Sequence, residues 1–242
     1  MIFESPTNPI TKIADVEAIT AAAHRHGALA VMDNTFGGLH QHGEFAVDIF
    51  LHSLTKFASG AGDVMGGALI ADAGLVRELR GEFTLFGGTL DPHAAWLIQR
   101  GLKTYFLRYR EQSATAMQIA ELLSAHPAVA RVHYPGLATH PRHALAARQM
   151  RDFGSIVSFD LAGGAEAGRR FAEALELFAL TASLGSTESL VMAPQMMGSR
   201  ELTPEQRRTA GITDGTVRLS IGLEDPDDLL EDVTYALDAA GG

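Results

Sequence analysis

A lysine and an aspartate stand at corresponding places, each just after an apolar run that has the length of a buried strand. Asp33 follows the run 28–32, and Lys56 follows the run 47–51 after a short spacer that contains Ser53 and Thr55. In open α/β sheets, ligands bind beyond the carboxyl ends of the strands. The sequence therefore predicts one site in which an amine nucleophile, a carboxylate and two hydroxyls lie together.

These groups form the set that is needed to hold pyridoxal 5'-phosphate (PLP). A lysine forms a Schiff base with the aldehyde of PLP, and a carboxylate partners the protonated nitrogen of its ring. The hydroxyls of Ser53 and Thr55 are suited to hydrogen bonds with the phosphate. Burial and a neighbouring iminium group favour the neutral amine that nucleophilic attack and proton abstraction require. Lys56 is therefore a candidate for holding the cofactor, and the alternative is a solvated lysine at the protein surface.

Arg218 lies in the mostly apolar strand pattern 217–221. A buried charge without a partner is costly, so an arginine at this place needs an acceptor. A planar guanidinium can hold a carboxylate through two parallel hydrogen bonds. Arg218 is therefore a candidate for carboxylate binding, and the alternative is an arginine at a strand edge that faces solvent.

Seven short motifs follow one another along the chain in a fixed order. They are Glu4–Pro9, Asp33–Phe36, His52–Lys56, Gly62–Gly67, Arg100–Thr104, Val132–Leu137 and Gly215–Asp225. The ordered series resembles the trans-sulfuration, or Cys/Met metabolism, family of PLP-dependent enzymes. That family includes cystathionine synthases and lyases, methionine γ-lyase and O-acetylhomoserine sulfhydrylase, and the resemblance extends from the first residues to the last helix.

The resemblance implies an α/β fold of the PLP-dependent transferase-like type, which is also called fold type I. Residues 1–113 would form the remainder of the PLP-binding large domain with a mostly parallel sheet, and residues 114–242 a smaller C-terminal α/β domain. It also implies roles for single residues. Lys56 would be the catalytic lysine, with Asn8, Asp33, Ser53 and Thr55 binding the cofactor and Ser183 and Arg218 binding the α-carboxylate of an amino acid substrate.

The resemblance further implies β- or γ-elimination or γ-replacement on cystathionine, methionine or an O-acylhomoserine. The enzymes of the family are homo-oligomers, and the tetramer is a dimer of dimers. The family chain begins well before the Glu4–Pro9 motif, and its earlier part supplies a loop that cradles the phosphate and an aromatic ring that stacks on PLP. Two alternatives to an active enzyme of this family stay open. One is an N-terminally truncated, catalytically impaired remnant of the family, and the other is a different PLP enzyme, such as an aminotransferase.

Two segments depart from the family pattern near the expected mouth of the substrate site. The family usually reads Leu-Gly-Gly-Val-Glu-Ser-Leu where this chain has residues 184–190 with Ser186 and Thr187 in the middle. It usually carries a Thr-His pair where this chain has Gly198 and Ser199. The choice among the substrates of the family therefore stays open.

Composition limits the class of protein. The chain has 242 residues, 46% hydrophobic content, no cysteine and a net charge of −10, which disfavours nucleic acid and anionic membranes as partners. No apolar run approaches the roughly 20 residues of a membrane span, and the N-terminus lacks the pattern of a signal peptide. We therefore expect a cytoplasmic protein. Ten histidines are present, but the pairs 40/42 and 140/143 lack a third ligand at metal-site spacing, so no metal is predicted.

Helical and extended patterns alternate, and the apolar runs are continuous, which together favour a buried, mostly parallel sheet. A long helical stretch from Pro92 to His126 contains the expected domain boundary. The other predicted elements are a helix that Asp15 caps and Gly27 ends, strands over 28–32, 47–52 and 67–70, a strand over 129–134, a helix over 143–150, a strand over 155–161, a helix over 165–177, a short strand near 180–184, a short helix after Thr203, a strand over 216–221 and a helix over 227–239.

Overall fold

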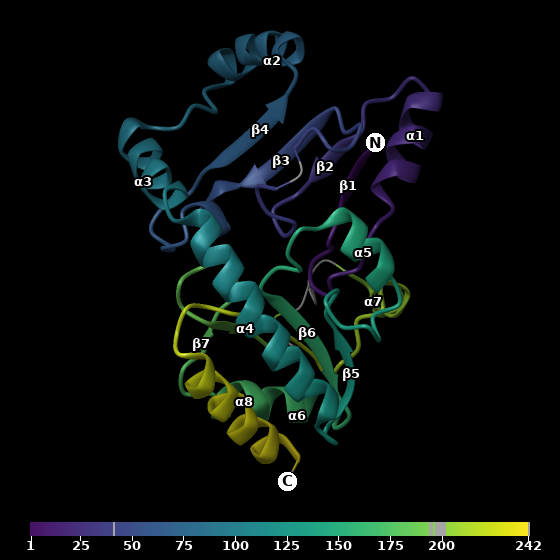
Figure 1. Ribbon diagram of the computed structural model, residues 1–242, viewed down its shortest axis with the longest axis vertical. Coiled ribbons are helices and arrows are strands. Elements are labelled where there is room, and N and C mark those ends of the chain that lie inside the picture. Colours follow the sequence, from purple (N-terminus) through teal and green to yellow (C-terminus); the bar gives the residue numbers. More distant parts are fainter. Residues whose placement is uncertain (41, 194–195, 197–201, 242) are drawn as a thin grey trace.

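A computed structural model describes residues 1–40, 42–193, 196 and 202–241 of the chain. Figure 1 shows two sheets, one in the upper and one in the lower half of the view, with a long helix running from one to the other. That helix is α4 (Tyr105–Ala125). The predicted boundary between residues 113 and 114 falls inside α4, and this division of the chain into two domains stays a prediction.

The first sheet contains the strands that precede the predicted site. Its order is β1-β2-β3-β4, with β1, β2 and β3 parallel and β4 antiparallel at the edge. The strands are β1 (Ile2–Glu4), β2 (Val31–Asp33), β3 (Ile49–Ser53) and β4 (Gly67–Ala71). Three helices belong to this half, namely α1 (Val16–Arg25), α2 (Ala73–Phe86) and α3 (Pro92–Leu102).

The second sheet has the order β5-β6-β9-β8-β7, and all its pairs except β7 with β8 are antiparallel. The strands are β5 (Val129–His133), β6 (Ile156–Leu161), β7 (Ala179–Leu180), β8 (Leu190–Met192) and β9 (Thr216–Ser220). The helices of this half are α5 (His143–Gln149), α6 (Gly164–Ala174), α7 (Pro204–Ala210) and α8 (Pro226–Gly241).

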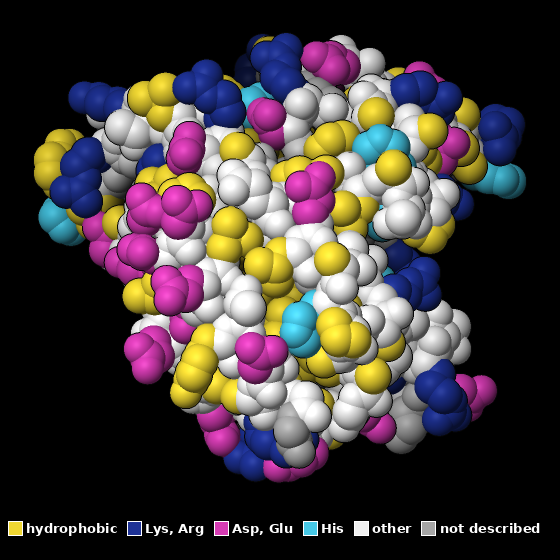
Figure 2. Space-filling model, turned by 60° about the horizontal axis from the view of Figure 1, so that its bottom comes forward, with side chains coloured by type: hydrophobic (Ala, Val, Ile, Leu, Met, Phe, Trp, Pro, Cys, Tyr) yellow, Lys and Arg dark blue, Asp and Glu magenta, His cyan; other side chains and the backbone are white. Residues whose placement is uncertain are grey.

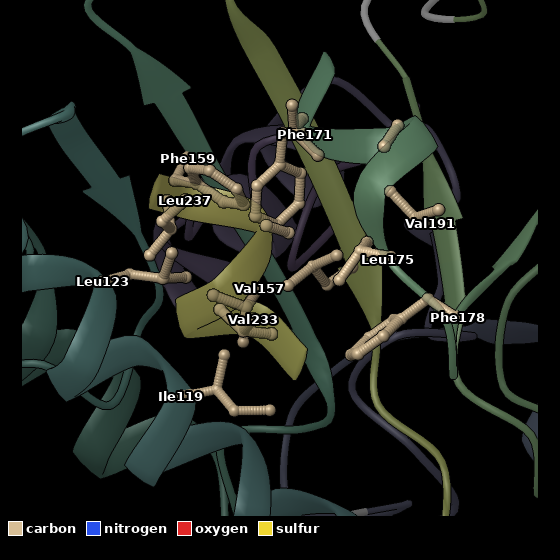
Figure 3. Close-up of a cluster of buried hydrophobic side chains, with 14 of the residues drawn as sticks. Ile119, Leu123, Val157, Phe159, Phe171, Leu175, Phe178, Val191, Val233 and Leu237 are labelled. Carbon is tan, nitrogen blue, oxygen red and sulfur yellow. The ribbon is translucent and has the colours of Figure 1, made fainter. Parts of the chain in front are cut away.

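The main hydrophobic core lies between the second sheet and helices α4, α6 and α8. Figure 3 shows Ile119 and Leu123 of α4 and Val233 of α8 meeting Val157 of β6, with Phe171 of α6 nearby. All five side chains are fully buried. Large apolar side chains packed at this density hold α4 firmly in place, so the polar residues on the other half of α4 have a fixed support.

Several element boundaries differ from the prediction. The strand predicted over 28–32 is β2 at 31–33, and helix α2 was not predicted. None of the side chains of α2 is buried. The long helical stretch is two helices, because the chain turns after Gly101, where the amides of Lys103 and Thr104 bond to Arg100 O and Gly101 O. The strand predicted near 180–184 ends at Leu180, and β8 was missed.

In the described part of the chain, no helix combines the length and the apolar character that crossing a membrane requires. On the face shown in Figure 2, Asp and Glu side chains gather toward the left of the view, and hydrophobic side chains run down its middle. Acidic surfaces repel polyanions. The cytoplasmic location stays a prediction.

Candidate active site

Lys56 lies just beyond the carboxyl end of β3, in a single π-helical turn, η1 (Leu54–Ala58). Its backbone departs from the helical region, with φ −90° and ψ −131°. The Nζ of Lys56 donates a hydrogen bond of 3.2 Å to the Oγ of Ser183, which lies 127 residues further along the chain. The fold therefore brings two of the predicted site residues, one from each half of the molecule, into contact.

Arg218 is in the middle of β9 and is only 2% exposed. Its Nη2 donates to the carbonyl oxygens of Ala182 at 3.0 Å and Ser183 at 2.8 Å. Its Nη1 donates to the Oδ1 of Asn8 at 2.8 Å. The alternative of a solvent-facing arginine at a strand edge is therefore wrong.

The guanidinium of Arg218 is not neutralised by a carboxylate of the described residues, because its acceptors there are carbonyl and amide oxygens. Its Nε is buried and has no hydrogen-bond partner among the described residues. Burial lowers the pKa of Arg218 to about 10. A buried cation with an unused donor is the arrangement that an anionic ligand group would complete.

Burial, and after it the positive charge of Arg218, lower the pKa of Lys56 below its ordinary value. Both effects disfavour the ammonium form. The same Arg218 is thus available to a ligand anion and helps to make the neighbouring lysine more easily deprotonated.

Asp33 and Ser53 end neighbouring strands, and a threonine joins these two strand ends. The amide of Thr35 donates to the Oδ1 of Asp33 at 3.0 Å, and the amide of Ser53 donates to the Oγ1 of Thr35 at 2.9 Å. In the register of the sheet, Glu4 of β1 pairs with Asp33 of β2. The carboxyl ends of the predicted strands before Asp33 and Lys56 therefore meet, and β1, which was not predicted, brings Glu4 to the same edge.

Thr55 uses its hydroxyl inside the loop that carries Lys56. Its Oγ1 accepts from the amide of Gly66 at 3.0 Å and donates to Gly66 O at 3.4 Å. The side chain of Ser53 does not cap the turn that follows it. Thr55 thus closes the loop between residues 55 and 66, and the phosphate contacts of Ser53 and Thr55 stay predictions.

Asn8 joins the first strand to Arg218. The backbone amide of Asn8 donates to the Oε1 of Glu4 at 3.1 Å, while its side-chain Oδ1 accepts from Arg218. Burial raises the pKa of Glu4, and the charge of Asp33 adds to this effect, whereas the bond from Asn8 opposes it. The predicted contact of Asn8 with the cofactor stays a prediction, and the hydrogen bond to Arg218 is an addition from the structure.

Two polar residues on the buried side of α4 hold the site together, and both were missed from the sequence. Arg108 donates to Phe57 O at 3.0 Å, to Gly101 O at 2.9 Å and to Thr104 Oγ1 at 3.1 Å. Gln112 donates to Ser186 O at 2.7 Å and to Ile221 O at 3.0 Å. Arg108, Gln112 and the buried Ala116 are spaced four residues apart and therefore share one face of the helix. Polar residues on a buried helix face need hydrogen-bond partners, and this spacing could have identified the two residues from the sequence.

His52, which the sequence left between a core and a functional role, is buried next to Ser53. Its Nε2 lies 2.7 Å from the Nε2 of His42, so one ring donates to the other. Burial, followed by the charge of His42, lowers the pKa of His52 to about 4. Among the described residues, no group of three or more His, Cys, Asp and Glu side chains is placed to hold a metal ion.

The chain matches the family of Cys/Met metabolism PLP-dependent enzymes over residues 1–238. The chain belongs to this family. The predicted family and the predicted fold class are thereby confirmed, and the motifs that carried the prediction lie within the matched range.

Relatives of the chain in the Cys/Met metabolism family are longer than the chain itself. It is 45% identical to the L-methionine gamma-lyase of Pseudomonas putida, covering 98% of this chain and 61% of that protein. It is 42% identical to the chloroplastic cystathionine gamma-synthase 1 of Arabidopsis thaliana, covering 98% of this chain and 42% of that protein. The structure of cystathionine gamma synthase from Xanthomonas oryzae pv. oryzae in complex with aminoacrylate and cysteine has a TM-score of 0.95 and 45% identity, covering 99% of this chain and 63% of that one. The chain thus spans about three fifths of the bacterial relatives.

The departures from the family pattern lie beside the lysine loop. The amide of Thr187 donates to Gly60 O at 2.8 Å, and Ser186 is buried and bonded to Glu188. The departures therefore lie against the segment that follows the turn of Lys56. Gly198 and Ser199 lie outside the described residues.

Proposed function

We propose that the chain carries the lysine, the ring-nitrogen partner and the carboxylate site of a PLP-dependent enzyme of sulfur amino acid metabolism. The reaction is a β- or γ-elimination or a γ-replacement on cystathionine, methionine or an O-acylhomoserine. Membership of the Cys/Met metabolism family supports this proposal.

The observation that carries the proposal is the position of Ser183 between two charged groups. Its Oγ accepts from the Nζ of Lys56, and its carbonyl oxygen accepts from the Nη2 of Arg218. One residue therefore separates an amine from a guanidinium. In an amino acid the α-carbon is bonded to the carboxylate carbon, so a substrate held by Arg218 would present its α-carbon toward Lys56.

The residues at the site fit PLP. The described groups include an amine with a lowered pKa at Lys56 and a carboxylate, Asp33, at the end of the neighbouring strand. Asp33 would keep the ring nitrogen protonated, and Asn8, Ser53 and Thr55 would bind the ring hydroxyl and the phosphate. When bound, PLP supplies an electron sink for the α-carbon of an amino acid.

Lys56 would move the protons of the reaction. As a neutral amine, its Nζ would take the α-proton of the substrate. As an ammonium, it would donate that proton to an atom further out in the side chain of the substrate. Ser183 accepts a hydrogen bond from Nζ and thereby keeps the amine on the side of the bound carboxylate. Arg218 orients the substrate and disfavours the ammonium form of Lys56.

Covalent labelling tests the assignment directly, because the chain has only three lysines, Lys12, Lys56 and Lys103. The chain is incubated with PLP, reduced with borohydride and digested for peptide mapping. We expect the pyridoxyl label on Lys56 and its loss in Lys56→Ala, with Lys103→Ala as the matched control. A label confined to Lys12 or Lys103, or no label on any lysine, contradicts the proposal and favours the impaired remnant.

Self-association is part of the proposal. Large apolar side chains of the first half are strongly exposed, with Met65 at 81%, Leu85 at 82% and Phe86 at 84%. Exposed apolar groups of this size favour contact with another protein surface. We expect a homo-oligomer in sedimentation velocity, and a monomer at all micromolar concentrations would contradict this expectation.

A further inference from the structure

A cavity lies apart from the lysine site, where residues before and at the start of α1 face strand β5 and the turn before α5. Its volume is about 750 Å³. The walls come from the segment before α1, the first turns of α1, strand β5, the turn before α5 and the residue after α7. Figure 1 shows α1, α5 and α7 on the same side of the molecule. Lys56, Asp33 and Arg218 do not line this cavity.

The lining is rich in basic groups. It includes Lys12, Arg131, Arg142, His133 and His140, although the chain as a whole has a net charge of −10. Within the described residues, no carboxylate lies within 4.0 Å of the charged nitrogens of the lysine and the two arginines. Three cations around one cavity attract an anion.

A single carboxylate, that of Asp15, contributes to the wall among the lining residues, and it has a structural task. It accepts from the amide of Ala18 and caps helix α1. The positive character of the cavity also acts on His140. Burial, followed by the charges of His133 and Arg131, lowers the pKa of His140 to about 4. Asp15 is thus engaged at the end of the helix, and Lys12, Arg131 and Arg142 supply the positive charge of the lining.

One wall of the cavity has a rigid polar side chain. His133 is 6% exposed, and its Nε2 lies 2.8 Å from the Oδ2 of Asp160. The Oδ1 of Asp160 accepts from the hydroxyls of Thr213 and Thr216. Burial opposes ionisation here, but the bonds from His133 and Thr216 lower the pKa of Asp160, so it stays a carboxylate. Asp160 thus fixes the ring of His133 in the wall.

Other walls are apolar. Ile10 and Ile13 are 4% and 3% exposed, and they line the cavity together with Ala14, Ala18 and Ile19. Apolar walls bury a hydrocarbon chain favourably, and basic groups bind a charged head. A ligand that satisfies both kinds of wall has an anionic head and an apolar body.

We propose that this cavity binds a small organic carboxylate with an aliphatic body. Lys12, Arg131 and Arg142 hold the carboxylate, and the isoleucine side of the cavity covers the aliphatic chain. The site is independent of PLP, because its lining includes none of the predicted cofactor residues. Occupancy can therefore be measured on the chain without cofactor, and the outcome is separate from that of the lysine labelling.

Isothermal titration calorimetry with hexanoate is the test. Inorganic phosphate serves as a probe with charge alone, and hexanamide as a probe with the aliphatic chain alone. We expect hexanoate to bind more tightly than both and to weaken as sodium chloride is added. Equal affinity for hexanamide, tighter binding of phosphate, or no heat from hexanoate up to millimolar concentration would each overturn the proposal.

Variants locate the bound hexanoate. We expect the dissociation constant to rise at least tenfold in Arg131→Glu and in Arg142→Glu. The exposed Ala18 lines the cavity, so Ala18→Phe fills it while leaving the charges in place, and it should also abolish binding. Arg77→Glu, on exposed helix α2, is the control and should change the constant less than twofold. Binding that the three lining variants retain, or an equal loss in Arg77→Glu, would overturn the proposal, and circular dichroism checks that each variant folds.

Discussion

Arg108→Met is the substitution that tests most sharply how the fold supports the lysine. Methionine has a similar length and no charge, so it keeps the aliphatic packing and removes the hydrogen bonds. The bonds that are lost hold the carbonyl oxygens of Phe57, directly after Lys56, and of Gly101 in α3. The substitution therefore releases the turn that carries Lys56 and leaves the rest of the site in place.

The expected magnitude follows from the bonds that are lost. Two carbonyl acceptors lie at 3.0 Å and 2.9 Å from the guanidinium of Arg108. A hydrogen bond from a charged donor contributes about 1.5–3 kcal/mol, which gives about 3–6 kcal/mol for two. Removing a buried charge also recovers part of its desolvation cost. We therefore expect a net loss of about 2–4 kcal/mol in the free energy that keeps the turn closed.

Hydrogen exchange measures this loss where it occurs. In the native turn, the amides of Ser59 and Gly60 bond to Leu54 O and Lys56 O. Since about 1.4 kcal/mol corresponds to tenfold, we expect these amides to exchange roughly 30- to 1,000-fold faster in Arg108→Met. Pyridoxyl labelling of Lys56 should fall in the same variant.

The matched control is Arg110→Met on the same helix, because Arg110 is exposed. It should leave exchange in residues 54–60 unchanged. Arg108→Lys should give an intermediate increase, since an ammonium is a point charge that replaces a planar fork. A change of less than threefold in Arg108→Met, or an equal change in Arg110→Met, would refute the clamping role.

Three further outcomes are expected. Gly101→Ala should lower the free energy of unfolding, because a Cβ there collides with the backbone of Ser59, whereas Gly81→Ala, with open space around it, should raise it by about 0.5–1 kcal/mol in urea titrations. In the folded protein the pKa of His52 is lowered to about 4, so below pH 6.5 the unfolded chain binds a proton that the folded chain does not. The free energy of unfolding should therefore fall by about 2 kcal/mol between pH 7 and pH 5. In His52→Gln the free energy of unfolding should depend less on pH. Arg218→Lys should weaken methionine binding in calorimetry at least tenfold while the pyridoxyl label on Lys56 persists, and an unchanged affinity would exclude Arg218 from carboxylate binding.

The sequence by itself determined the local elements that carry the candidate site. Asp15 accepts from Ala18 N at the start of α1, as a capping aspartate should, and the apolar run before Lys56 is strand β3. These features depend on short-range propensities and on the burial of a continuous apolar run, which residues close in sequence encode. The ends of β2 and β3 could therefore be predicted to deliver Asp33 and Lys56 to the same edge.

Tertiary structure alone decided how the distant parts of the site meet. Asn8 contacts Arg218 across 210 residues, and Lys56 contacts Ser183 across 127. A repeating pattern in the sequence says which face of a strand is buried, but it does not say what that face meets. The mostly antiparallel second sheet was not predicted for the same reason, because strand direction depends on the path of the connecting chain. The role of Arg108 was also decided by the tertiary structure. A polar residue on a buried helix face requires hydrogen-bond acceptors, but only the packed fold shows that one of them is the carbonyl of Phe57, the residue after Lys56.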